Sequence, residues 1–138
     1  MIKTDYIKVE TEGNTEIINI TSEVKKIAES SGIKEGVVSI FVAHTTAGLA
    51  IMEFEPGSIK DLKEEFEKLA PSEKTYHHGD VVDGNNGQSH IRGALLKPCL
   101  TVPLVDKGLV LGTWQSIVLV DFDIKKRERK VVVQVVGE

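Results

Sequence analysis

Three histidines, His44, His78 and His90, have sequence neighbours that are typical of catalytic or ligand-binding residues. His44 directly follows an apolar segment, while His78 and His90 belong to a long polar segment, 76–92, that holds three of the four histidines. A polar connection of this length in a compact domain is usually functional or disordered, and its histidines and tyrosine argue against disorder. Three imidazoles with one open position make a catalytic zinc arrangement. We therefore interpret His44, His78 and His90 as catalytic residues and as candidate metal ligands.

The same histidines allow a second interpretation that needs no zinc. They could hold a phosphate group or act as acid and base. Asp80 and Asp83 follow His78 closely, and carboxylates favour hard ions such as Mg²⁺, which usually enters with the phosphates of a substrate. These aspartates and Asn86 are also typical of turns beside glycine. The sequence therefore leaves open whether a divalent ion binds and whether it is Mg²⁺ or Zn²⁺.

Hydroxyl groups and one carboxylate follow the first apolar strand. Thr45 and Thr46 precede Gly48, and their hydroxyl and backbone N–H groups could bind an anion. Glu53 stands at the end of the next apolar stretch and could act as a ligand or a base. A polar segment at the end of a buried strand suits chemistry because the strand fixes its position. We add Glu53 to the catalytic candidates.

Three later residues complete the candidate site. Trp114 needs a partner for its ring N–H, and Gln115, beside it in an apolar stretch, needs a hydrogen-bond partner or a ligand. Arg129 could reach a phosphate, although its basic run, 125–130, is also typical of a solvated hairpin turn. We therefore predict a site for a small phosphorylated molecule, with these binding residues: Thr45, Thr46, Asp80, Asp83, Asn86, Trp114, Gln115 and Arg129.

Length and composition narrow the class of protein. A chain of 138 residues is expected to form one domain, 1–138, and its net charge of −4 gives no general electrostatic reason to bind nucleic acid. No basic-then-apolar leader and no membrane-spanning apolar run are present, so we expect a cytoplasmic protein that does not bind membranes. The single cysteine, Cys99, lies in an apolar run and is expected to be a buried thiol.

Apolar periodicity predicts the elements that must position these residues. Gly36–Ala43 is β-branched and almost continuously apolar, as expected of a strand covered on both faces. Pro56–Leu69 has the spacing of an amphipathic helix. Further expected elements are strands 3–10, 16–20, 49–52, 100–105, 109–123 (interrupted at 112–115) and 130–136, and short helices within 21–32 and 89–96. This pattern predicts an α+β fold: a mainly antiparallel β-sandwich, jelly-roll-like, with two or three helices.

The chain carries these motifs in order: His44-Thr45-Thr46-Ala47, Glu53, Asp61, Tyr76-x-His78, Ser89-His90-Ile91 and Gly112-Thr113-Trp114-Gln115. Together they resemble the YjbQ family, whose members are described as proteins of unknown function and also as secondary thiamine-phosphate synthases. The resemblance covers nearly the whole chain and includes Arg129 and the valine-rich last strand. It implies a β-rich sandwich with helices, assembled as a homotrimer with sites near subunit boundaries, in which the three histidines lie together.

The resemblance also implies a reaction, in which a hydroxymethylpyrimidine diphosphate joins a thiazole phosphate and pyrophosphate leaves. Such a transfer requires cations, Mg²⁺ or N–H donors for the leaving charge, and close approach of both substrates. Two segments depart from the family pattern: Asn-Glu-Asn becomes Met52-Glu53-Phe54, and Asp-Asp-Met-Pro becomes Asp83-Gly84-Asn85-Asn86-Gly87-Gln88. A metal-dependent hydrolase using the three histidines and a non-catalytic small-molecule binding protein are the alternatives.

Overall fold

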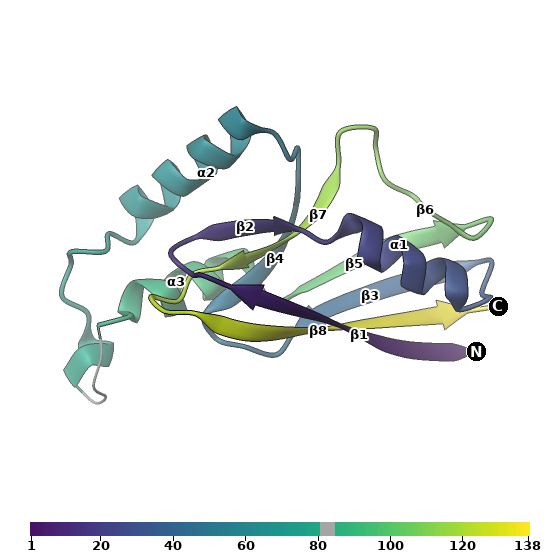
Figure 1. The fold of residues 1–138 in the computed structure, drawn as a ribbon, viewed down its shortest axis with the longest axis horizontal. Helices are drawn as coiled ribbons and strands as arrows, with labels where there is room; N and C mark the ends of the chain where they lie inside the picture. Colours follow the sequence, from purple (N-terminus) through teal and green to yellow (C-terminus); the bar gives the residue numbers. More distant parts are fainter. Residues whose placement is uncertain (81–84) are drawn as a thin grey trace.

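Two antiparallel sheets organise the chain in the computed structural model, which describes residues 1–80 and 85–138 (Figure 1). The larger sheet has the strand order β1 (Ile2–Thr11), β8 (Arg127–Gly137), β3 (Gly36–Val42), β5 (Cys99–Val105) and β6 (Gly108–Leu109). The smaller sheet has the order β2 (Glu16–Asn19), β7 (Ser116–Asp121) and β4 (Ala47–Met52). Every strand pair described is antiparallel, so the predicted α+β fold with mainly antiparallel sheet is confirmed.

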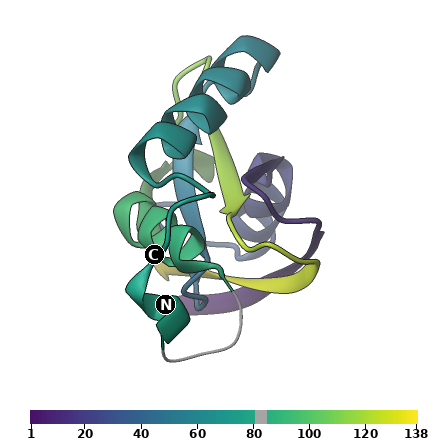
Figure 2. The same ribbon diagram turned by 90° about the vertical axis from the view of Figure 1, so that its left-hand side faces the viewer.

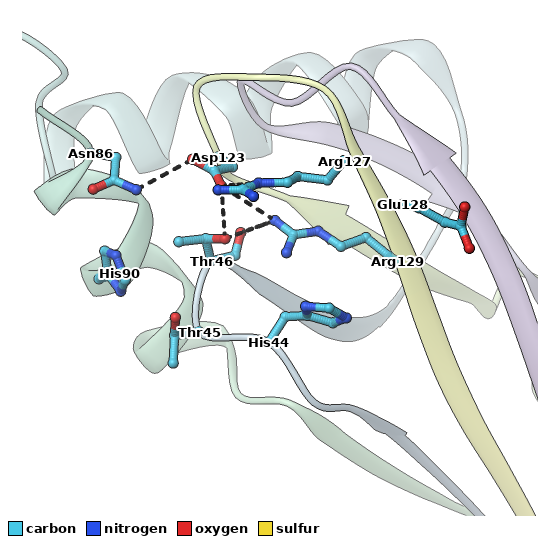
Figure 3. A pocket seen from close by; sticks show the side chains of 9 residues that line it. All are labelled: His44, Thr45, Thr46, Asn86, His90, Asp123, Arg127, Glu128 and Arg129. Carbon is cyan, nitrogen blue, oxygen red and sulfur yellow. Dashed lines mark hydrogen bonds and ion pairs between the residues drawn. The ribbon is translucent and has the colours of Figure 1, made fainter. Parts of the chain in front are cut away.

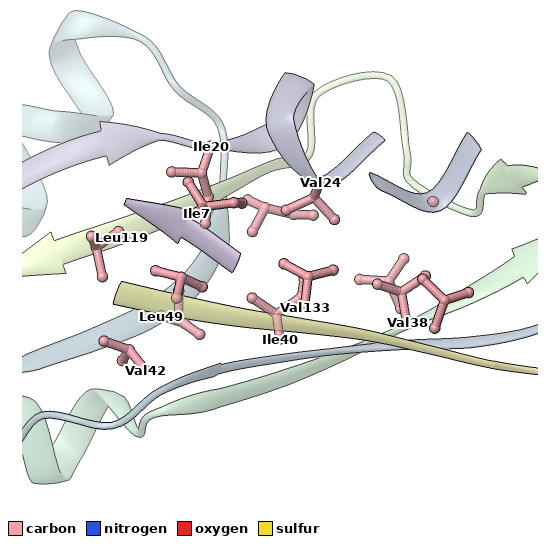
Figure 4. Packing of buried hydrophobic residues seen from close by; sticks show 14 of the residues in the cluster. Ile7, Ile20, Val24, Val38, Ile40, Val42, Leu49, Leu119 and Val133 are labelled. Atoms are coloured by element: carbon pink, nitrogen blue, oxygen red, sulfur yellow. The ribbon is translucent and has the colours of Figure 1, made fainter. Parts of the chain in front are cut away.

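The main core lies between the two sheets. Because side chains alternate along a strand, one face of each strand can be apolar while the other stays open. On β3, Val38, Ile40 and Val42 are fully buried and face Leu49 of β4 and other core side chains (Figure 4). Helix α1 (Thr21–Ser30) closes the same core with Val24 and Ala28.

The outer face of the smaller sheet is covered by helix α2 (Pro56–Leu69), which explains the continuous apolar run of β7. Val118 and Val120 of β7 pack in a second cluster with Phe66 of α2 and Phe122, whose ring centroids are 4.8 Å apart. Figure 2 shows α2 and helix α3 (Gly87–Leu96) on one side of the molecule and α1 on the other. The short helix η1 (His77–Asp80) precedes α3 in the chain.

The pairing of β4 with β7 defines two ends of the smaller sheet. Ala47 pairs with Asp121 at one end, and Met52 pairs with Ser116 at the other. Strands advance by about 3.4 Å per residue, so these ends are about 17 Å apart. We name them the His44 end and the Trp114 end, after the segments that adjoin them.

Two sequence-based expectations are wrong. Cys99 is exposed, because it points outward from the larger sheet while its neighbours Leu100 and Val102 alternate toward the interior. Residues 109–123 do not form one interrupted strand, because β6 belongs to the larger sheet and β7 to the smaller, with residues 110–115 between them. Within the described residues, no helix is long and apolar enough to cross a membrane.

Candidate functional site

A buried ion pair joins β7 and β8 at the His44 end. The side chains of Asp121 and Arg129 are only 0% and 3% exposed, and Arg129 Nε and Nη2 donate to the two Asp121 carboxylate oxygens at 2.6 and 2.9 Å. The Thr11 hydroxyl of β1 donates to the same carboxylate. Burial favours a raised pKa for Asp121, but the hydrogen bonds from Arg129 and Thr11 outweigh it and hold the pKa below its usual value. This pair ties three strands together.

A second buried carboxylate, Asp123, continues the network toward the surface. Arg129 Nη2 donates to Thr46 Oγ1 at 2.7 Å, and the Thr46 hydroxyl donates to Asp123 Oδ2 at 3.3 Å. Asp123 also accepts from Arg127 Nε at 2.8 Å and from Asn86 Nδ2 at 3.3 Å. Burial favours a raised pKa for Asp123, but the backbone N–H that follows it and Arg127 hold the pKa below its usual value. Both of its oxygens therefore already have hydrogen-bond donors.

These groups border an open cavity of about 380 Å³ (Figure 3). In Figure 3, Asn86 and His90 lie on the α3 side, and Arg127 and Arg129 on the β8 side; the segment after β3 lies between them. We call this the anion cavity, because guanidinium, imidazole and hydroxyl groups dominate its lining. Its nine lining residues are His44, Thr45, Thr46, Asn86, His90, Asp123, Arg127, Glu128 and Arg129.

The histidines of the anion cavity are poised to be neutral. Burial lowers the pKa of His44, and the positive charge of Arg129 adds to the effect. Burial also lowers the pKa of His90, with a further contribution from His78, whose ring centroid is 4.3 Å from that of His90. The structure thus places His44 and His90 on one cavity and His78 against His90. Neutral imidazoles of this kind can accept a proton or a hydrogen bond.

The described residues do not offer the donor set of a resident metal. Among them, no group of three His, Cys, Asp or Glu side chains could hold a metal ion. Asp123 is unsuited to that role because its oxygens already accept from protein donors. Asp83 and the side chain of Asp80 lie outside what the structure describes. The cavity fits an anion held by cations and hydroxyl groups better than it fits zinc.

An apolar cavity of about 310 Å³ adjoins the anion cavity. The two cavities share His44, Thr45 and His90. The rest of the apolar lining consists of small side chains and one ring: Ala47, Gly93, Ala94 and Pro98. Gly93 is required here, because a Cβ atom at this position would lie only 2.7 Å from the carbonyl oxygen of Thr45.

Three predicted site residues lie at the other end of the smaller sheet. Glu53 is exposed just after β4, and Trp114 is 73% exposed. Gln115 is also exposed, and its Oε1 accepts from the backbone N–H of Gly112 at 2.7 Å, within its own turn. None of these residues is among those that line the anion cavity. The candidate residues are therefore divided between the His44 end and the Trp114 end.

Sequence reasoning missed three residues of the network, although the sequence carries a signal for them. Asp121 and Asp123 stand two apart at the end of an apolar strand, and Arg127 stands two before Arg129 at the start of β8. Residues two apart on a strand share a face, so two carboxylates and two guanidinium groups could have been expected to meet. The basic run 125–130 is divided, since Lys125 and Lys126 are exposed in the turn as expected.

Comparisons with known proteins agree with this architecture. A model of the UPF0047 protein YjbQ-like family matches residues 5–138. A UPF0047 protein of Methanothermobacter thermautotrophicus is 35% identical over 137 residues, which cover 99% of this chain and 94% of that protein. A UPF0047 protein of Mycobacterium tuberculosis is 36% identical over 128 residues, which cover 93% of each.

Solved structures show the same fold. The crystal structure of a YbjQ-like protein of unknown function from Sulfolobus solfataricus has a TM-score of 0.89 and 31% identity, with both chains fully covered. An uncharacterised conserved protein of the YjbQ/UPF0047 family from Clostridium acetobutylicum has a TM-score of 0.87 and 31% identity, over 96% of this chain and 99% of that one. This chain therefore belongs to the YjbQ-like UPF0047 family.

Proposed function

We propose that this protein is a phosphate-handling transferase of the thiamine-phosphate synthase type, acting on small phosphorylated molecules in the cytoplasm. One observation carries the proposal: the anion cavity, which is lined by the partly exposed Arg127, adjoins an apolar cavity. The two cavities share His44, Thr45 and His90. A molecule with a phosphate group and an apolar ring matches this pair of cavities. A plain phosphate-binding surface would not need the apolar half.

Arg127 is the cation best placed to meet a phosphate. Its side chain is 40% exposed, whereas Arg129 is 3% exposed and is held by Asp121. The ion pair with Asp123 uses the Nε of Arg127, so its two Nη groups can face phosphate oxygens in the fork geometry that guanidinium favours. His44 would add a second donor, because an approaching negative charge favours its protonated form.

The reaction that the family resemblance implies makes use of both cavities. The thiazole nitrogen forms a bond to the methylene carbon of the pyrimidine, and the bond from that carbon to the diphosphate oxygen breaks. Pyrophosphate takes the electron pair, so its departure is helped by positive charge at its oxygens. Arg127 and protonated His44 would supply that charge, and Mg²⁺ would enter with the diphosphate. The apolar cavity would hold a ring close to the reacting carbon.

A direct assay tests the proposal. The purified protein is mixed with the pyrimidine diphosphate, the thiazole phosphate and Mg²⁺, and the joined product is separated and measured. We expect Arg127→Gln and His44→Ala to lower the rate at least about tenfold, since a charge-assisted hydrogen bond contributes about 1.5–3 kcal/mol. Lys125→Gln is the matched control, because it removes a cation from the exposed turn beside Arg127. A wild-type rate equal to that of His44→Ala removes the catalytic claim, and saturable phosphate binding without turnover favours the binding-protein alternative.

We also propose that the active form is a homotrimer, as the family resemblance implies. The candidate residues lie at opposite ends of the smaller sheet, so they can share one site only if the Trp114 end of one copy meets the His44 end of another. Unlike ends meet in head-to-tail rings such as trimers and also in two-fold dimers, so the choice of a trimer rests on the family resemblance.

The outer face of the larger sheet supports contact between copies. Strand register places Tyr6, Val132, Phe41 and Cys99 in one cross-strand row on this face. Tyr6 is 49% exposed and Phe41 is 42% exposed, and adjoining exposed apolar side chains of this kind mark interaction surfaces. A second copy of the chain is the partner we propose.

Subunit mixing tests the shared site. His44→Ala and Trp114→Ala subunits, each impaired alone, are unfolded together and refolded as mixed assemblies. We expect activity to return, because some interfaces then combine an intact His44 end with an intact Trp114 end. If the mixture is no more active than either variant, the two ends do not share a site. Light scattering that gives a monomer mass contradicts the trimer itself.

A further inference from the structure

We propose that a second cavity, on the opposite face of α3 from His90, binds a small monoanion that carries a hydroxyl group. The cavity has a volume of about 190 Å³ and lies between the β1–β2 turn, α2 and α3. Gln88 and Arg92 are four residues apart on α3, so they lie on one helix face, while His90 points away from it. The site therefore does not share the groups assigned to the anion cavity.

Gln88 supplies the first argument for a ligand. Its side chain lines the cavity and the residue is 5% exposed. Its Oε1 atom is buried and accepts no hydrogen bond from any part of the chain that the structure describes. Buried side-chain acceptors are paired as a rule, because an unpaired one has given up water without replacing it. A ligand that donates a hydrogen bond at this point would satisfy Gln88.

Arg92 and its surroundings supply the second argument. Arg92 is 4% exposed, and it donates to the Ala70 carbonyl oxygen at 2.7 and 3.2 Å, to Glu67 Oε2 at 2.8 Å and to Thr15 Oγ1 at 3.0 Å. Nη1 has one partner, Thr15, in the described contacts and carries two hydrogens, so one hydrogen can reach a further acceptor. Lys63, exposed at the rim, adds a second cation.

The backbone conformation of Thr15, which lines this cavity, is the third argument for a ligand site. Thr15 has a φ of 63°, in the left-handed region that β-branched residues seldom adopt. This conformation is accompanied by burial, with Thr15 3% exposed and its hydroxyl accepting from Arg92. Unusual backbone conformations of this kind cluster at ligand clamps and active sites.

The charges and volume narrow the ligand class. Lys63 and Arg92 are positive and Glu67 is negative, which leaves a net charge of about +1 for a single anionic group to balance. Gln88 requires a donor, which a hydroxyl group provides. A volume of about 190 Å³ holds roughly six non-hydrogen atoms, at about 30 Å³ per water-sized group. A small α-hydroxycarboxylate has all three properties.

Titration with lactate tests the proposal, with propionate as the matched probe that lacks the hydroxyl group. Binding is followed through the NMR signals of the Gln88 side-chain amide, which are assigned by their loss in Gln88→Leu. We expect a saturable shift with lactate at millimolar concentration and at least tenfold weaker binding of propionate. Arg127→Gln, in the anion cavity, should leave lactate binding unchanged, so failure here is distinct from failure of the transferase proposal.

The variant Gln88→Leu tests whether Gln88 binds a ligand or only stabilises the fold. Because it removes an unpaired acceptor, the variant should unfold at the same urea concentration as wild type or a higher one, and it should bind lactate no better than propionate. Equal binding of the two probes by wild type overturns the assignment of Gln88. The absence of any saturable shift, with only an ordered water at Oε1 in a crystal, overturns the site.

Discussion

The two ends of the β4–β7 pair differ in how their polar residues are held. At the His44 end, Asp121, Arg129 and Thr46 are buried, and hydrogen bonds join β7, β8 and the segment before β4. At the Trp114 end, Trp114 is 73% exposed, and the side-chain hydrogen bond that the structure describes for Gln115 lies within its own turn. The first end is organised by the chain itself. We propose that the exposed side chains of the Trp114 end are held in place by contact with another subunit. We therefore assign binding of the charged groups of the substrate to the His44 end and subunit contact to the Trp114 end.

The largest expected effect is on folding, and it belongs to the His44 end. Asp121→Ala would leave Arg129 as a buried charge without its carboxylate, and breaking such a pair costs about 3–5 kcal/mol. We expect urea unfolding to show a loss of this size in the free energy of unfolding. Glu53→Ala, which removes an exposed carboxylate at the Trp114 end, should change it by less than about 0.5 kcal/mol. Equal losses in the two variants would abolish the distinction between the ends.

The next effect belongs to the Trp114 end and concerns association. Trp114→Ala should leave the unfolding free energy of the separated chain unchanged, since the side chain is exposed. It should weaken subunit association by about 2 kcal/mol or more, or roughly 30-fold, as expected of a tryptophan at the centre of an interface. Light scattering over a dilution series measures this, and Leu69→Ala, which truncates another exposed apolar side chain, is the control.

The chain contains a single tryptophan, so its fluorescence reports on the same contact. Emission should shift to longer wavelength on dilution as Trp114 moves from an interface to water. A wild-type spectrum that is water-like and equally quenched by acrylamide at all concentrations would show that this end is never covered.

The sequence predicts the fold class and part of the site for identifiable reasons. Alternation and apolar runs report which face of a strand is buried, and polar residues that follow such runs, such as His44 and Thr46, lie at strand ends. Strand register decides the rest. Whether Trp114 and His44 lie at the same end of the smaller sheet or at opposite ends depends on how β4 pairs with β7, and no local pattern reveals that pairing.

The pair of Asp121 with Thr11 shows the same limit. These residues are 110 positions apart. They meet because β1 pairs with β8 in the larger sheet, while Asp121 of the smaller sheet is held against β8 by its ion pair with Arg129. Cys99 shows the opposite error: its apolar run predicts a buried thiol, but the strand has one open face and Cys99 lies on it. In both cases the missing information is which elements neighbour each other in space.

A smaller effect distinguishes Arg127 from Arg129 in the anion cavity: we expect the first to affect mainly anion affinity and the second mainly stability. Arg127→Gln should lower the affinity for inorganic pyrophosphate about tenfold, as measured by calorimetry, because it removes the half-exposed cation. Its effect on unfolding should be smaller than that of Arg129→Gln, because Arg127 is 40% exposed and the buried Asp123 keeps its donors Thr46, Asn86 and the backbone N–H of Ile124. Arg129→Gln should show the reverse order, with a large loss of stability. Loss of both properties in both variants would mean that the two guanidinium groups act as one structural unit.

The smallest effect is the pH dependence of the His44 end. Burial lowers the pKa values of His44 and His90 below the ordinary 6.5, so between those lowered values and 6.5 the unfolded chain binds more protons than the native one. Stability should therefore fall as pH drops through this window. Asp121 and Asp123, whose pKa values are lowered from 3.8, add their loss only at lower pH. The histidine contribution should be the smallest of these effects, because solvent screens these partly exposed rings.

Anion binding should have the opposite pH slope in the same window. A bound dianion raises the pKa of His44, so binding takes up a proton and strengthens as pH falls. Sulfate is the suitable probe because its charge stays constant between pH 5 and 7, and calorimetry at several pH values measures its affinity. His44→Gln should flatten the slope of sulfate binding and reduce the slope of stability, to which His90 still contributes. Glu53→Gln, at the Trp114 end, should change neither slope. Sulfate affinity that falls together with stability would mean that His44 faces the protein and not the ligand, and the anion cavity would then lose its second donor.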